Sequence, residues 1–185
     1  MINIDSLMRT APVIPVLVVE DPARARPIAQ ALVARGYPVL EVTLRTPAAL
    51  EVIAEMARVE GAIVGAGTVL NERDLDASLA AGGRFVVSPG LTESLARAAI
   101  DRRVPFLPGV ATAGDIMRGL DLGLDRFKFF PAVAAGGLPA LKALSAPFHQ
   151  CRFCPTGGIS EATAPDWLAL EAVLCVGGSW VAAGL

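Results

Sequence analysis

Lys128 stands inside an aromatic run, residues 126–131 (RFKFFP), in a chain whose sixteen basic residues include only one other lysine. An amine among phenylalanine side chains is partly desolvated, which favours the neutral form that attacks a carbonyl carbon. The run therefore indicates Schiff-base chemistry at Lys128. The other lysine, Lys142, lies in the helical segment GLPALKAL, where we expect a solvated side chain.

A carboxylate and a guanidinium share one face of an earlier strand, in the segment LEVTLRT (40–46). Side chains alternate along an extended chain, so Glu41, Thr43 and Arg45 point one way and the intervening leucines and valine the other. The same parity places Lys128 and Phe130 together, opposite Phe127 and Phe129. A structural Lys128–Glu41 ion pair is the alternative, but a buried pair adds little stability over apolar residues, which favours a catalytic role.

Strand-like and helix-like segments alternate along the whole chain, which is typical of βα units around a parallel sheet. Eight units in one domain, residues 1–185, predict a compact α/β fold, a (β/α)8 barrel, with a doubly wound open sheet as the alternative. The expected strands are 13–19, 38–44, 62–68, 85–90, 105–110, 126–132, 152–158 and 174–180, and the expected helices are 24–35, 48–58, 72–81, 92–102, 113–122 and 138–146.

Glycine-rich turns follow most of the predicted strands, and the last two clusters are Gly157-Gly158 and Gly177-Gly178-Ser179. Active sites of (β/α)8 barrels lie at the carboxyl ends of the strands, and the loops after the seventh and eighth strands often bind phosphate through backbone N–H groups. Glycine also serves plain tight turns. We therefore expect a phosphorylated ligand, with ordinary turns as the alternative.

Composition limits the function classes. Hydrophobic residues make up 54% of the chain, and a net charge of −2 without a basic block argues against nucleic-acid or anionic-membrane partners. The first residues do not resemble an export signal, so we expect a cytoplasmic protein with free, buried cysteines. Cys151 and Cys154 form a CxxC, but their strand parity places them on opposite faces. His149 is the only histidine, which argues strongly against a metal site built on imidazoles, whereas a carboxylate-bound Mg²⁺ stays open.

The motifs together resemble those of the 2-keto-3-deoxy-6-phosphogluconate (KDPG) aldolase family, in the same order over essentially the whole chain. The resemblance implies a metal-independent, cofactor-free class I lyase of the Entner–Doudoroff pathway that also cleaves 4-hydroxy-2-oxoglutarate, built as a homotrimer of (β/α)8 barrels. The matching segments are LEVTLRT (40–46), VGAGTVL (64–70), SPGLT (88–92), FKFFPA (127–132), CPTGGIS (154–160) and CVGGSW (175–180).

Position by position, the resemblance implies that Lys128 forms the Schiff base and Glu41 is the general acid/base. The other implied site residues bind or enclose the substrate. They are Arg45 and Thr68 for the pyruvate carboxylate, Pro89 and Phe130 as pocket walls, Thr156 beside the reacting centre, and Gly157, Gly158, Gly178 and Ser179 for the phosphate.

Two alternatives to this activity are an aldolase for the epimeric 6-phosphogalactonate substrate and a non-catalytic sugar-phosphate-binding barrel. The family continues through a final helix that covers the eighth strand, whereas this chain stops at Leu185. Without that helix we expect the outer side of residues 174–180 to be bare, which is an aggregation hazard, so we expect the natural chain to continue beyond Leu185. The alternative is an incomplete barrel whose phosphate site near Ser179 is less firmly held.

Overall fold

Nine short parallel strands form a closed ring in the computed structural model, which describes residues 3–185. One sheet has the order β5-β4-β3-β2-β1-β9 and the other β6-β7-β8, and the bridge from Thr156 to Gly177 joins β8 to β9. The strands are β1 (Val13–Leu17), β2 (Val39–Thr43), β3 (Ile63–Gly67), β4 (Val86–Val87), β5 (Phe106–Leu107), β6 (Gly109–Val110), β7 (Arg126–Phe129), β8 (Arg152–Pro155) and β9 (Val176–Gly178).

The fifth predicted strand is divided into β5 and β6 by Pro108, which has no N–H to donate to a sheet. Its carbonyl still accepts a hydrogen bond from the Lys128 N–H at 2.9 Å, so the two pieces act as one barrel strand. Counted in this way, the ring has the eight strands predicted. The (β/α)8 barrel is confirmed, and the open sheet is wrong because no strand in residues 3–185 is left at an edge: β9 joins both β1 and β8, and the fifth strand joins both β4 and β7.

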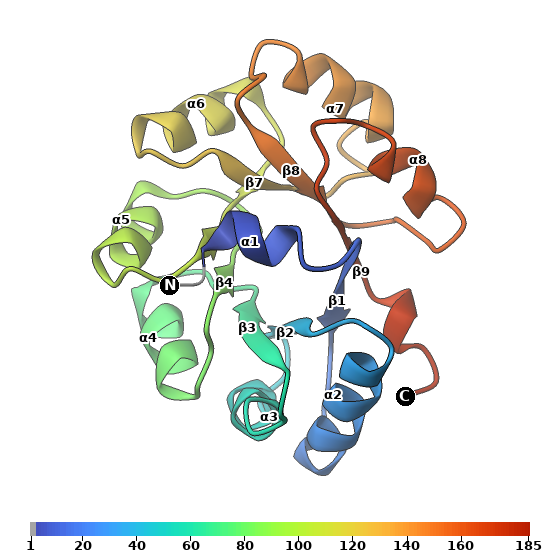
Figure 1. Ribbon diagram of the computed structural model, residues 1–185. Helices are drawn as coiled ribbons and strands as arrows, with labels where there is room; N and C mark the ends of the chain where they lie inside the picture. Colours follow the sequence, from blue (N-terminus) through green and yellow to red (C-terminus); the bar gives the residue numbers. More distant parts are fainter. Residues whose placement is uncertain (1–2) are drawn as a thin grey trace.

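Helices surround the ring of strands (Figure 1). They are α2 (Ala25–Ala34), α3 (Ala49–Met56), α4 (Glu72–Ala80), α5 (Glu93–Asp101), α6 (Ala113–Asp121), α7 (Gly137–Ser145) and α8 (Ala164–Leu168). The side chains of Asn71, Thr92 and Thr112 cap α4, α5 and α6, since each accepts a hydrogen bond from the backbone N–H three residues further along the chain, a group that has no partner within the helix. Nowhere in residues 3–185 is a helix both long and apolar enough to cross a membrane.

A short helix that the sequence did not predict, α1 (Ile4–Met8), lies across one end of the barrel, in front of the ring in Figure 1. Leu7 and Met8 are buried in a core cluster with Ile14 of β1. The Asp5 carboxylate accepts a hydrogen bond of 2.6 Å from Nε of Arg126, the first residue of β7. Helix α1 therefore closes the end where the strands begin.

Core side chains follow the predicted alternation. Phe127 and Phe129 are fully buried outside the ring, where Phe129 packs on Trp167 of α8 with ring centroids 6.4 Å apart. Cys151 belongs to this outer core, and Cys154 to the inner cluster beside α1, so the CxxC cysteines lie on opposite faces as predicted. All three cysteines are free and buried, and the adjacent Cys154 thiol, together with burial, raises the pKa of Cys175.

The outer side of β9 is covered, contrary to the expectation of a bare face. Val176 is fully buried in the cluster that contains Trp167, and the Trp180 ring lies against Gly178. A 3-10 turn, Trp180–Ala182, follows β9 and places this ring. The expectation was wrong because a single aromatic side chain and α8 suffice to cover a three-residue strand.

Candidate active site

The amine of Lys128 donates a hydrogen bond of 3.0 Å to Oε1 of Glu41 inside the barrel. Only 7% of the lysine side chain and 4% of the glutamate side chain are exposed. Lys128 lies on β7 and Glu41 on β2, and these two strands stand on opposite sides of the barrel. The centroid of the Phe130 ring lies 5.4 Å from Nζ of Lys128, so the ring forms an aromatic wall beside the amine.

A glycine on the neighbouring strand makes room for the Glu41 carboxylate. Gly67 of β3 pairs with Thr43 of β2, and a Cβ at position 67 would lie 2.2 Å from Oε1 of Glu41. Any larger residue would have to displace the carboxylate or the backbone. Gly67 therefore helps to determine where the carboxylate lies relative to Lys128.

Arg45 follows β2 on the same side as Glu41, as its parity predicts. Its Nε donates a hydrogen bond of 3.2 Å to Oγ1 of Thr43, and its side chain lines the same cavity as Lys128. Among residues 3–185, no carboxylate lies within ion-pair distance of Arg45. The guanidinium is therefore available for an anionic ligand.

Thr68 follows β3 and has a left-handed backbone, with φ of 60°. β-branched residues rarely adopt this conformation, and such strained residues concentrate at functional sites. Thr68 lines the cavity with Pro89, which follows β4. The backbone conformation at Thr68 is thus maintained at a cost in stability, at the position where the family resemblance implies a carboxylate contact.

Two glycines with left-handed backbones follow β8, with φ of 104° at Gly157 and 79° at Gly158. Both line the cavity together with Thr156 and Ser179. In the described part of the chain, neither glycine N–H donates a hydrogen bond within the protein. These amides are therefore free to bind anionic oxygens.

Lys128 and most of the predicted site residues line one cavity of about 320 Å³. Gly178 does not line it, because its Cα faces the Trp180 ring on the outer side of β9. Four further residues line the cavity without having been assigned a role from the sequence: Val16, Thr43, Ile159 and Gly177. The sequence predicts Thr43 on the inner face and Gly177 in the last glycine-rich turn, whereas it does not single out Val16 and Ile159.

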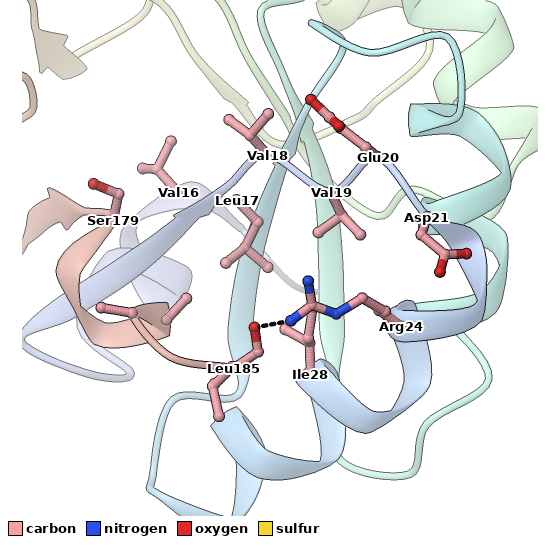
Figure 2. A pocket seen from close by; sticks show the side chains of 12 residues that line it. Val16, Leu17, Val18, Val19, Glu20, Asp21, Arg24, Ile28, Ser179 and Leu185 are labelled. Carbon is pink, nitrogen blue, oxygen red and sulfur yellow. Dashed lines mark hydrogen bonds between the residues drawn. The ribbon is translucent and has the colours of Figure 1, made fainter.

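A second, larger cavity of about 580 Å³ lies between the segment after β1, helix α2 and the turn after β9 (Figure 2). Arg24 donates a hydrogen bond to the Leu185 carbonyl there, drawn as a dashed line. Val16 and Ser179 line both cavities, so Ser179 lies at their boundary. Neither Lys128 nor Glu41 lines this larger space.

The smaller cavity combines an amine able to form an imine, a carboxylate in contact with it, a free guanidinium and unpaired backbone amides. This set suits a substrate with a carbonyl, a carboxylate and a further anionic group. Within residues 3–185, no group of three His, Cys, Asp or Glu side chains is placed to share a metal ion.

Comparisons with known proteins agree with this chemistry. The family described as KDPG and KHG aldolase matches residues 4–184. The KHG/KDPG aldolase of Escherichia coli K12 is 54% identical over 178 residues, which cover 96% of this chain and 84% of that protein.

Two solved structures are also similar. The 2-keto-3-deoxy-6-phosphogluconate aldolase of Zymomonas mobilis ZM4, solved with 3-phosphoglycerate, is 63% identical with a TM-score of 0.95 over 96% of this chain and 85% of that one. The KDPG aldolase of Legionella pneumophila, solved with pyruvate as a covalent carbinolamine, is 45% identical with a TM-score of 0.93 over 97% and 87%. A match across the whole barrel, together with the lysine–glutamate pair inside it, shows that this chain belongs to the KDPG and KHG aldolase family.

Proposed function

We propose that this protein is a class I aldolase that cleaves 2-keto-3-deoxy-6-phosphogluconate into pyruvate and glyceraldehyde 3-phosphate. The observation that carries the proposal is the contact of 3.0 Å between the buried Lys128 amine and the Glu41 carboxylate. An amine that forms an imine needs a partner that moves protons, and a carboxylate within hydrogen-bond distance can do so.

In the first half of the reaction, the Lys128 amine adds to the C2 carbonyl carbon and gives a carbinolamine. Glu41 first accepts a proton from the lysine nitrogen and then donates it to the carbinolamine hydroxyl, which leaves as water, so the product is an iminium whose nitrogen is Nζ. The positive nitrogen can then accept an electron pair. The pyruvate complex of the Legionella pneumophila relative, captured as a carbinolamine, supports this route.

In the second half, Glu41 accepts the proton of the C4 hydroxyl and the C3–C4 bond breaks. Its electron pair forms the C2–C3 double bond of an enamine, while C4 leaves as the aldehyde of glyceraldehyde 3-phosphate. Glu41 then returns a proton to C3, and water hydrolyses the iminium to pyruvate and the free Lys128 amine.

The remaining roles form part of the same proposal. Arg45 and Thr68 bind the pyruvate carboxylate, since Arg45 has no carboxylate partner in residues 3–185 and a guanidinium pairs well with one. Pro89 and Phe130 enclose the pyruvate half, and Thr156 lies beside the reacting centre.

The phosphate role falls to the loops after β8 and β9. The free N–H groups of Gly157 and Gly158, with Ser179, support a phosphate site, and Gly178 contributes through its backbone alone because its Cα faces outward. The 3-phosphoglycerate in the Zymomonas mobilis relative supports a phosphorylated ligand.

The same site is proposed to cleave 4-hydroxy-2-oxoglutarate to pyruvate and glyoxylate, because the part of this substrate that becomes pyruvate is the same as in 2-keto-3-deoxy-6-phosphogluconate. The name of the Escherichia coli relative, KHG/KDPG aldolase, supports this second substrate. We also infer assembly as a homotrimer, which sedimentation of the purified protein would measure.

Borohydride reduction in the presence of pyruvate tests the mechanism. We expect peptide mass spectrometry to find a reduced pyruvate adduct on Lys128 and none in the Lys128→Arg variant, because a guanidinium keeps the charge but forms no imine. An adduct on Lys142 alone, or no adduct, would exclude the proposed chemistry. A coupled assay for glyceraldehyde 3-phosphate then distinguishes the gluconate from the galactonate substrate.

A further inference from the structure

The hydroxyl of Thr43 lies between the end of β1 and the guanidinium of Arg45. Thr43 is the last residue of β2, is only 2% exposed, and lines the cavity beside Glu41. It donates a hydrogen bond of 2.9 Å to the Leu17 carbonyl and accepts one of 3.2 Å from Nε of Arg45. The first bond spans 26 residues and the second only two, so one hydroxyl group connects Arg45 to the backbone of β1.

The two bonds have different consequences. A hydroxyl has one proton, and the bond to Leu17 uses it, so the oxygen lone pairs are oriented toward the cavity side. Nε of Arg45 uses one of these lone pairs. Because Nε is the inner nitrogen of the guanidinium, this bond leaves both terminal nitrogens free for a bidentate pair of hydrogen bonds to a carboxylate.

Arg45 needs such support because the rest of its surroundings do not hold it. It lies after the strand, its side chain is exposed, and within residues 3–185 the bond to Thr43 is the only side-chain hydrogen bond that it makes. A long side chain that is free to adopt many rotamers loses entropy when it binds a ligand. A bond that restricts it beforehand reduces this loss.

We propose that Thr43 is a positioning residue that holds the Arg45 guanidinium ready for the carboxylate of the substrate. This inference rests on the proposed function, in which Arg45 binds the pyruvate carboxylate. Thr43 itself takes no part in the chemistry at Lys128. Its effect therefore concerns substrate affinity, because the carboxylate is bound both before and during bond cleavage.

The chain provides a matched control in Thr46. Its hydroxyl donates a hydrogen bond of 3.0 Å to the Val19 carbonyl, so it links the segment after β2 to the segment directly after β1. Thr46 makes no bond to Arg45 and does not line the cavity. Thr46→Val therefore removes a bond to a carbonyl two residues beyond Leu17 without removing the acceptor for Arg45.

The test compares KM and kcat for Thr43→Val, Thr43→Ser and Thr46→Val, with folding checked by urea unfolding. Valine keeps the shape of threonine but has no hydroxyl to accept the bond from Arg45. We therefore expect about a tenfold rise in KM, with kcat within about twofold of the parent. Thr43→Ser restores the hydroxyl and should return KM to the parent value, and Thr46→Val should leave it unchanged. A normal KM in Thr43→Val, or an equal rise in Thr46→Val, would overturn the proposal.

A double-mutant cycle with Arg45→Gln shows whether Thr43 acts through Arg45. If it does, Thr43→Val raises KM in the parent but causes no further rise in the Arg45→Gln background. An equal rise in both backgrounds would contradict the positioning role. If Arg45→Gln alone leaves KM unchanged, the carboxylate role of Arg45 fails, and an inactive parent protein would instead contradict the proposed function.

Discussion

The Lys128 ammonium and the Glu41 carboxylate lie 3.0 Å apart although their strands stand on opposite sides of the barrel. Both side chains are almost completely buried, so each is the main compensation for the other's lost hydration. The contact therefore serves both stability and catalysis. Removing either partner should affect the two properties in different ways.

Glu41→Gln should lower kcat for KDPG cleavage about a hundredfold or more, because an amide cannot accept and return the proton. It should also lower the free energy of unfolding by about 3–5 kcal/mol, since a buried ammonium loses its counter-charge. Steady-state kinetics and urea unfolding measure the two effects. The double variant Lys128→Met/Glu41→Gln, inactive but without a buried charge, should be more stable than Glu41→Gln, and retained turnover in Glu41→Gln would refute the proton-transfer role.

Gly67→Ala should reduce activity although it replaces no reacting group. Its new Cβ would lie 2.2 Å from Oε1 of Glu41, so the carboxylate has to leave its position beside Lys128 or the backbone has to shift. We expect kcat to fall about tenfold or more, because misplaced proton donors lose efficiency steeply.

The matched control for this change is Gly114→Ala in α6, where the new methyl group has ordinary contacts at 3.8 Å. Alanine also suits a helix better than glycine, so this variant should keep full activity and equal or greater stability. Equal activity in the two alanine variants, measured in the same coupled assay, would show that Gly67 does not determine the position of Glu41.

Asp5→Asn should weaken the packing of α1 on the barrel in a pH-dependent way. Hydrogen bonds from Arg9 and then Arg126 hold the pKa of the Asp5 carboxyl below its ordinary value. The stabilisation is therefore complete above the ordinary pKa of about 3.9 and is lost as the pH falls through the lowered pKa of the folded state.

About a third of the Asp5 side chain is exposed, so solvent screening limits the effect to about 1 kcal/mol or less. Urea unfolding of both proteins should give a constant difference from about pH 7 to about pH 5 and a shrinking one below about pH 4. A difference that persists unchanged in acid would mean that the Asp5 charge contributes nothing.

Thr68→Gly should separate stability from substrate binding. Glycine adopts a φ of 60° without strain, and this relief of about 1 kcal/mol roughly offsets the entropy that glycine adds to the unfolded chain. The free energy of unfolding should therefore stay close to that of the parent, while KM rises because the hydroxyl is lost. In Thr68→Ala the strain remains, so a Thr68→Gly variant clearly less stable than Thr68→Ala would contradict the strained conformation.

The sequence by itself determined the features that depend on local period. Alternation along β2 and β7 assigned Glu41, Thr43 and Lys128 to the inner side and Phe127 and Phe129 to the outer side, as the structure has them. Repetition of βα units predicted the barrel in the same way. Both signals survive in a single sequence because side-chain direction along a strand is a property of the backbone alone.

Only the tertiary structure decided which inner side chains meet. The Lys128–Glu41 distance and the room that Gly67 leaves both depend on strand register across the ring. Helix α1 also escaped prediction, because five residues are too few to show helical periodicity and its ion pair joins Asp5 to Arg126, far along the chain. Closure of the barrel sets these contacts, and closure is a long-range property that no local pattern contains.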